Sequence, residues 1–183
     1  MAYPNKVIAN PRNGMQLRFI QTAKGTNGAL LEMEATYQPL STEPPLHFHP
    51  GQAEDFEVLE GEMMLRMNGG TRVLKVGDRL HIPAKTPHAM WNNGPAIAVT
   101  NWQVRPALNM EHFFETTMGL AADGKTNANG VPNILQAALT VNKFAPVFRM
   151  MKPPYIVQKL LFGILTPFAY LLGYRATYEK YLN

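Results

Sequence analysis

The stretch His47-Phe48-His49-Pro50-Gly51-Gln52-Ala53-Glu54 brings two histidines and a carboxylate close together in the chain. Residues two apart on a strand point to the same face, so the imidazoles of His47 and His49 are expected to converge. The Pro50-Gly51 pair is a turn signal, and it allows the following strand to return the carboxylate of Glu54 to the same place. The stretch therefore predicts three ligands of one metal site at the junction of two strands.

A second stretch supplies a fourth ligand. It runs Gly77-Asp78-Arg79-Leu80-His81-Ile82-Pro83 and is followed by His88 and Asn92. A strand carrying His88 can pair beside the strand of His47. Three histidines and one carboxylate form a mixed nitrogen and oxygen set, which suits iron, manganese, nickel, zinc or copper without selecting among them. Four protein ligands leave one or two positions open for water, dioxygen or a chelating substrate.

Composition limits the chemistry and the partners of the chain. Its 183 residues suffice for one domain with a core and an appendage, and the lack of cysteine excludes disulfides, thiolate zinc sites and a cysteine nucleophile. The net charge of +4 is too small to indicate nucleic-acid binding. Residues 1–11 contain no apolar core of a signal peptide, so a cytoplasmic location is expected.

The hydrophobic pattern divides the chain into two parts. Between residues 15 and 104, short alternating or apolar runs recur about every ten residues, which is typical of an antiparallel sandwich or barrel. Asn68-Gly69 predicts a type I′ hairpin between two of these strands. Later segments have helical character: 110–120, 134–141, 143–151 and 155–174. We therefore predict a β domain over residues 1–106 and a helical extension over residues 107–183.

The two ligand stretches resemble the two sequence motifs of the cupin superfamily. The first motif is matched by His47, His49, Glu54 and Gly61, and the second by Gly77, Pro83, His88 and Asn92. Two turn glycines of the motifs are replaced, by Ser41 and Lys85, which leaves the ligands intact but puts the local turns in question. The short interval between Gly61 and Gly77 resembles that of small, single-domain bacterial cupins.

The resemblance implies a mainly β fold: a jelly-roll double-stranded β-helix, the cupin barrel, followed here by C-terminal α-helices. It places the metal inside the barrel near its mouth. Similar cupins include dioxygenases, isomerases, decarboxylases, storage proteins and sensor domains, so the fold alone does not assign an activity. One hypothesis is a dioxygenase-like oxidoreductase acting on a small apolar, oxygen-bearing substrate, with Glu54 also serving as a catalytic base. The other is a metal-dependent binding module without turnover.

Period-two alternation predicts which side chains surround the metal. Residues that share a strand face with Glu54 or His88 should point into the barrel, while others of the same pattern form plain core. The predicted substrate pocket consists of Tyr37, Gln52, Phe56, Met63, Met90 and Trp102. An apolar cavity with one polar metal at its end is the usual construction of a small-molecule site.

The C-terminal tail is basic and apolar. After residue 142 it carries six cations and the single anion Glu179, and no charge lies between Leu160 and Tyr174. This segment is shorter than the roughly 20 apolar residues of a spanning helix. We expect a helix that is buried or packs on a partner subunit; attachment of residues 155–174 to an anionic membrane surface is the alternative. Because open sheet edges need covering, we also expect a homodimer, with these helices at the barrel mouth or the interface.

Overall fold

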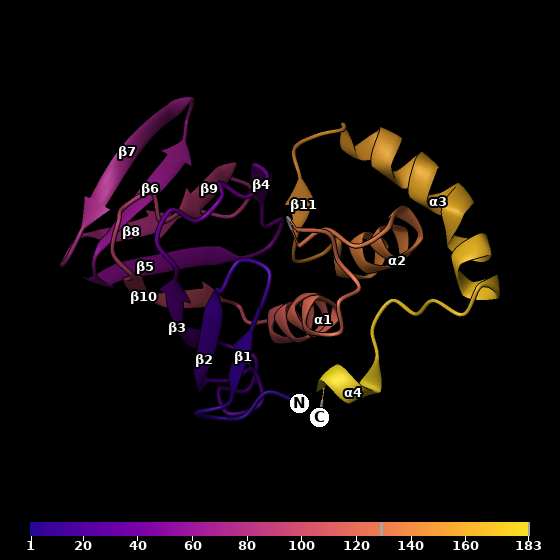
Figure 1. Ribbon diagram of the computed structural model, residues 1–183, viewed down its shortest axis with the longest axis horizontal. Coiled ribbons are helices and arrows are strands. Elements are labelled where there is room, and N and C mark those ends of the chain that lie inside the picture. Colours follow the sequence, from indigo (N-terminus) through magenta and orange to yellow (C-terminus); the bar gives the residue numbers. More distant parts are fainter. Residues whose placement is uncertain (129, 183) are drawn as a thin grey trace.

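Two antiparallel β-sheets pack against each other, and the helices gather at one end of them (Figure 1). The computed structural model describes residues 1–128 and 130–182. The strands are β1 (Val7–Ala9), β2 (Gln16–Gln21), β3 (Leu31–Tyr37), β4 (His47–Phe48), β5 (Ala53–Glu60), β6 (Glu62–Met67), β7 (Gly70–Lys75), β8 (Arg79–Ile82), β9 (His88–Trp91), β10 (Ala98–Arg105) and β11 (Arg149–Met150). The helices are α1 (Met110–Ala122), α2 (Ile134–Phe144), α3 (Tyr155–Leu171) and α4 (Glu179–Leu182).

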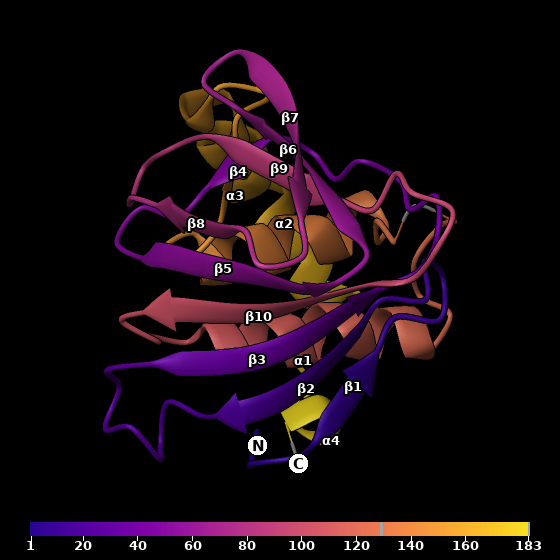
Figure 2. The ribbon, with the colours of Figure 1, turned by 90° about the vertical axis from the view of Figure 1, so that its left-hand side faces the viewer.

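The strand order is that of a jelly roll. One sheet has the order β1-β2-β3-β10-β5-β8 and the other the order β11-β4-β9-β6-β7. Neighbouring strands are often distant in the sequence, because the chain crosses repeatedly from one sheet to the other. Figure 2 shows the strands in front and most of the helical extension behind them. The predicted double-stranded β-helix with C-terminal helices is confirmed.

The core lies between the sheets and follows from the alternation in the sequence. Every second residue of β3 is buried, beginning with Leu31, and β10 repeats the pattern from Ala98 to Val104. All four residues of β9 are buried, which suits a central strand covered on both faces. The inward rows of β3, β5 and β10 meet the apolar residues of β6 and β9, so the barrel is filled at its centre.

Two glycine-containing turns set the strand order around the site. Asn68 and Gly69 both have positive φ, 54° and 76°, and join β6 to β7 as the predicted type I′ hairpin. Gly61 has φ 69° and lies so close to the Ile97 carbonyl oxygen that a Cβ would be 2.4 Å from it. Only glycine fits there, and the turn sends the chain from β5 in one sheet to β6 in the other.

The extension differs from its prediction in one segment. A helix was expected over residues 143–151, but α2 ends at Phe144 and Arg149–Met150 form β11. The amides of Val147 and Phe148 both bond to the Phe144 carbonyl, so the chain turns back toward the barrel. There the edge of β4 offers unpaired backbone groups, and β11 pairs with it antiparallel. The division into domains at residue 106 stays a prediction.

Helices α1 and α3 have different surroundings. On α1, Glu111 accepts a 2.9 Å hydrogen bond from the Ala23 amide, and Glu115 pairs with Lys6 at 2.7 Å, which ties the helix to the six-stranded sheet. Helix α3 lies outermost, beyond α2 (Figure 1). Most of it is exposed, so the expectation of a buried helix within this chain is wrong. None of the helices in the described part of the chain is long and apolar enough to cross a membrane.

Candidate metal centre

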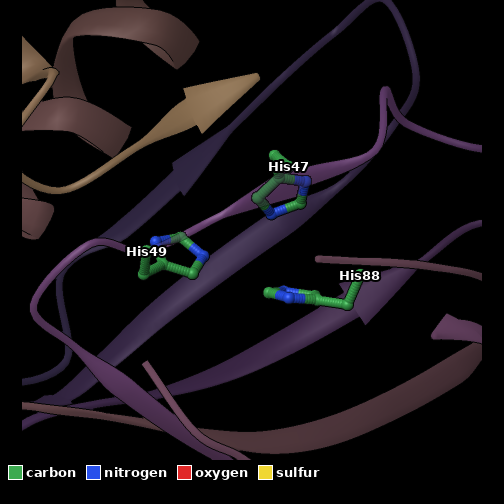
Figure 3. Close-up of side chains that lie close together, drawn as sticks. All are labelled: His47, His49 and His88. Atoms are coloured by element: carbon green, nitrogen blue, oxygen red, sulfur yellow. The ribbon is translucent and has the colours of Figure 1, made fainter. Parts of the chain in front are cut away.

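Three histidines from one sheet converge at the end of the barrel that faces the extension. His47 lies on β4 directly opposite His88 on β9, and His49 follows one residue after β4. One ring nitrogen of each lies within 4.8 Å of the others. Figure 3 shows the three rings arranged around a common space. The structure thus brings together the three histidines that the sequence singled out.

The other ring nitrogen of each histidine faces a backbone carbonyl. Nδ1 of His47 is 2.9 Å from the Pro45 oxygen, Nδ1 of His88 is 3.0 Å from the Thr86 oxygen, and Nδ1 of His49 is 2.5 Å from the Val147 oxygen. A carbonyl oxygen only accepts, so each Nδ1 must carry the proton and donate it. The lone pair of every neutral ring is then on Nε2. This is the second-sphere arrangement that orients histidines toward a metal.

Glu54 approaches the same point from the opposite sheet. It lies on β5 and is fully buried. Its Oε2 is 3.2 Å from Nε2 of His49 and 2.9 Å from Nε2 of His88. Its Oε1 accepts a 3.0 Å hydrogen bond from the indole Nε1 of Trp102 on β10. The carboxylate is therefore fixed at one oxygen and presents the other to the histidines.

The donor atoms fit a divalent metal. Nε2 of His49 and Oε2 of Glu54 are buried without an aligned hydrogen bond, which is costly unless something else satisfies them. Two ligands about 2.1 Å from one ion and at right angles to each other are about 3 Å apart, close to the separations of Oε2 from the two imidazoles. The three histidine nitrogens therefore form a group that could hold a divalent metal, and Oε2 of Glu54 lies beside two of them, outside the group in which all donor atoms are within 4.8 Å of one another.

The electrostatics of the site affect the protonation of Glu54, His47 and His49 in different ways. Burial disfavours the charged state of Glu54, but His49 and His88 outweigh it and the pKa of this carboxyl is lowered. Burial and the neighbouring histidines lower the pKa of His47 to about 3, so its ring stays neutral. Burial also opposes protonation of His49, but the charge of Glu54 and the Val147 carbonyl prevail and raise its pKa. A metal would therefore compete with a proton on His49.

A cavity of about 160 Å³ adjoins the three histidines. Apart from these histidines, its walls are almost entirely apolar or aromatic. The lining residues are Met15, Tyr37, Pro44, His47, His49, Phe56, His88, Met90, Trp102, Phe113, Phe114 and Phe148. Four residues predicted for the pocket are among them: Tyr37, Phe56, Met90 and Trp102. Burial, and then the charge of Glu54, raise the pKa of Tyr37, so its phenol remains protonated.

Two residues predicted for the pocket lie elsewhere. Met63 is fully buried in the barrel core and is not part of the cavity wall. Gln52 is also buried, but its amide donates 3.0 Å hydrogen bonds to the carbonyls of Pro106 and Ala107. Its position beside Glu54 in sequence suggested a ligand contact. In space it fastens the loop before β5 to the start of the extension.

The extension supplies part of the cavity that the sequence analysis did not identify. The Phe148 ring stacks on His47 with centroids 4.7 Å apart, and also on Phe113 at 4.9 Å. Phe114 meets the face of Trp102 edge-on. The only sequence signal was the expectation of helices at the barrel mouth or at a subunit interface. Which aromatic residues do so depends on where β11 returns to β4.

The two residues that replace motif glycines, Ser41 and Lys85, make backbone contacts of their own. The Ser41 hydroxyl accepts from the Asn92 amide at 2.9 Å, and the Ser41 amide donates to the Asn92 carbonyl at 2.8 Å. Lys85 adopts the left-handed conformation with φ 66°, and its amide donates to the His49 carbonyl at 2.8 Å. Both turns therefore form without glycine, and the one at Lys85 contacts a histidine of the site.

Fold and site together define a jelly-roll protein with three converging histidines inside its barrel and the buried carboxylate of Glu54 beside two of them. The cupin domain family matches residues 33–102. A probable oxidoreductase, virH, of Hypocrea virens is 32% identical over 151 residues, which cover 75% of this chain and 67% of that protein. The chain belongs to the cupin superfamily.

Solved structures agree on the fold. A predicted oxalate decarboxylase of Thermotoga maritima superposes with a TM-score of 0.50 at 22% identity, covering 56% of this chain and 92% of that one. A Klebsiella pneumoniae protein with a double-stranded β-helix domain has a TM-score of 0.44 at 22% identity, covering 50% and 72%. At 22% identity the likeness to the Thermotoga maritima structure shows the fold alone and assigns no activity.

Proposed function

We propose that this cupin binds one divalent transition metal through His47, His49, His88 and Glu54 and acts as a small-molecule oxidoreductase of the dioxygenase type. The observation that carries the proposal is the protonation pattern of the site. Three Nδ1 atoms face carbonyls, which leaves three Nε2 lone pairs free for a metal, and those of His49 and His88 lie beside the buried Oε2 of Glu54. The name of the Hypocrea virens relative supports an oxidoreductase over the other cupin activities.

Trp102, Tyr37 and Glu54 have separate roles in the proposed site. A metal bound there would polarise oxygen atoms of a substrate and, if it is iron or manganese, support oxidation by dioxygen. Trp102 holds Glu54 in place, and the protonated phenol of Tyr37, which also bonds to Thr100, lies at the cavity wall where it would meet a substrate oxygen. The lowered pKa of Glu54 favours its role as a ligand over the predicted role as a base, since a base works best with a pKa near the operating pH.

The cavity restricts the substrate by size and polarity. Its 160 Å³ is well below the roughly 300–1,000 Å³ of pockets for drug-sized ligands. Aromatic walls contributed by Phe56, Phe113 and Phe148 favour a flat, unsaturated compound. We therefore propose a substrate of catechol or small diketone size that presents one or two oxygen atoms to the metal, and we expect flavonol-sized compounds to be excluded.

The test begins with metal analysis of the purified protein, followed by reconstitution with Fe(II), Mn(II), Ni(II) or Zn(II). Oxygen uptake is then measured with catechol, acetylacetone and a flavonol. We expect uptake with a small substrate and the iron- or manganese-loaded protein, and its loss in His88→Ala. If His88→Ala takes up oxygen as fast as the unchanged protein, the histidine site does not take part in the reaction.

The rival function is metal-dependent binding without turnover. It is favoured by the Phe148 ring, which stacks on both His47 and Phe113, because an aromatic wall against the histidines also suits a retained ligand. Strong thermal stabilisation by metal together with no oxygen uptake for any substrate would support it.

For the assembly, we propose a homodimer formed through sheet edges, of which β7 is an exposed one. A monomer in light scattering would contradict that.

A further inference from the structure

The outer face of α3 is a continuous apolar surface that the rest of the chain leaves uncovered. The buried side chains of this helix are Gln158, Phe162 and Ala169, which lie on one side of it. The opposite side is formed by large apolar residues that are 42–83% exposed: Ile156, Val157, Leu160, Leu161, Ile164, Phe168 and Leu171. At 100° per residue these seven span a broad arc without a charged or polar residue. A patch of this size marks an interaction surface.

Basic residues surround this face, and acidic ones are missing. Lys152 precedes the helix, Lys159 flanks the apolar arc and Arg175 follows its end, and all three are exposed. From residue 124 to 178 the sequence contains no aspartate or glutamate. The surface therefore combines an apolar strip with a cationic border. That combination complements an anionic lipid surface, in which acyl chains lie beneath negative headgroups.

A second copy of the chain fits this face less well. A twofold contact places the same patch on both partners, so two α3 helices would bring their cationic borders together. No acidic residue within residues 124–178 is available to neutralise them. Like charges placed against each other weaken an interface. Helix α3 also lies at the outer edge of the molecule, beyond α2 (Figure 1), and its apolar side chains are exposed there.

We propose that α3 lies in the interface of an anionic membrane and anchors the protein to it peripherally. The helix would rest parallel to the surface with its apolar face among the upper acyl chains and its cations at the phosphates. Its buried side stays packed on α2, where Asn142 donates to Thr166 at 3.1 Å. The barrel and its cavity would then remain in water beside the membrane.

Binding is tested by cosedimentation of the full chain with vesicles of equimolar phosphatidylcholine and phosphatidylglycerol, and of phosphatidylcholine alone. We expect binding to the anionic vesicles, loss of it in the triple variant Leu160→Gln, Ile164→Gln, Leu171→Gln, and retention in the control Val7→Gln, Val76→Gln, Ile97→Gln. The control removes three exposed apolar residues from the barrel instead. A further variant, Lys152→Gln with Lys159→Gln, should bind at least about tenfold more weakly, since each cation near the surface contributes about fivefold.

The orientation of α3 is tested with a single thiol, because the chain has no cysteine. An environment-sensitive dye on Ile164→Cys should shift to the blue with anionic vesicles, and the same dye on Val76→Cys should not. Absence of cosedimentation overturns the proposal, as does equal binding by the triple variant. A wild-type dimer that the triple variant converts to monomer, without vesicle binding, would assign the face to a second copy. Metal content should be the same in all variants, so these results are independent of the proposed function.

Discussion

The indole Nε1 of Trp102 donates a 3.0 Å hydrogen bond to Oε1 of Glu54, and this bond leaves only Oε2 of the carboxylate facing His49 and His88. Trp102 is itself held between two rings: it stacks on Phe56 with centroids 5.2 Å apart and meets Phe114 edge-on. The oxygen that would bind metal is thus positioned by an aromatic group that also forms a cavity wall.

Removing this hydrogen bond should weaken metal binding without unfolding the barrel. Trp102→Phe keeps an aromatic ring between Phe56 and Phe114 but lets Glu54 rotate, and loss of such an outer partner typically lowers metal affinity about 10- to 100-fold. Competition with a chelator measures the change. The matched control is Trp91→Phe, the same change at the only other tryptophan, which lies away from Glu54 on β9. Equal affinity in the two variants would show that Trp102 does not position the carboxylate.

Metal affinity should depend on pH through His49. The pKa of this imidazole is raised above its ordinary 6.5 by Glu54 and the Val147 carbonyl despite its burial, and a proton on Nε2 excludes the metal. Affinity should therefore fall about tenfold per unit as pH drops below that raised pKa and level off above it. His47, whose pKa is about 3, adds no dependence in this range.

Calorimetry in two buffers of different ionisation enthalpy measures the proton released. We expect the number of protons released to decrease as pH rises through the raised pKa of His49. Glu54→Gln serves as the comparison: without the carboxylate charge the pKa of His49 falls, so the same transition should move to lower pH even though overall affinity drops. A transition that does not move would contradict the assignment to this pair.

The barrel and the convergence of the three histidines follow from local rules, which explains why the sequence predicts them. His47 and His49 share a strand face by period two, and Asn68-Gly69 provides the positive φ values of a tight hairpin. The spacing of Glu54 and His88 from their turns is equally local. The sequence did not reveal which backbone carbonyls accept hydrogen bonds from the histidine rings. The Val147 oxygen that orients His49 is a backbone group, and no side-chain pattern marks it.

The path of residues 145–151 is a second feature that the sequence could not predict. A strand of two residues has no periodicity to detect, and β11 exists because the edge of β4 pairs with it. That pairing brings Phe148 onto His47, a contact set by tertiary structure. The same applies to Gln52, whose amide bonds to the carbonyls of Pro106 and Ala107 and not to a ligand near Glu54.

Phe148 should control access to the metal. Its ring covers His47 and stacks on Phe113, so Phe148→Ala should open the cavity and speed removal of bound metal by a chelator several-fold. Equilibrium metal affinity should change little, because the four donor atoms are untouched. Stopped-flow mixing of the Co(II)-loaded protein with a chelator follows the rate. Phe168→Ala, which removes an exposed ring on α3, is the control and should leave the rate unchanged. The same rate in both variants would show that access does not pass Phe148.

Lys85 should be a site where glycine stabilises the protein. A residue with a Cβ in the left-handed region costs about 1–2 kcal/mol, and Lys85 has φ 66° where the cupin motif has glycine. Lys85→Gly relieves this cost but adds about 0.5–1 kcal/mol of unfolded-state entropy, so we expect a net gain of about 0.5–1 kcal/mol in the free energy of unfolding. Urea denaturation of the metal-free protein measures it.

The comparison variant is Lys75→Gly at the end of β7, where the backbone is extended and glycine should cost about 0.5–1 kcal/mol. If Lys85→Gly raises the free energy of unfolding and Lys75→Gly lowers it, the backbone conformation is the cause, because the same side chain is removed in both. Destabilisation by Lys85→Gly would instead mean that its side chain contributes more than its φ costs. Metal affinity should be retained in Lys85→Gly, since the amide that donates to the His49 carbonyl is present in either residue.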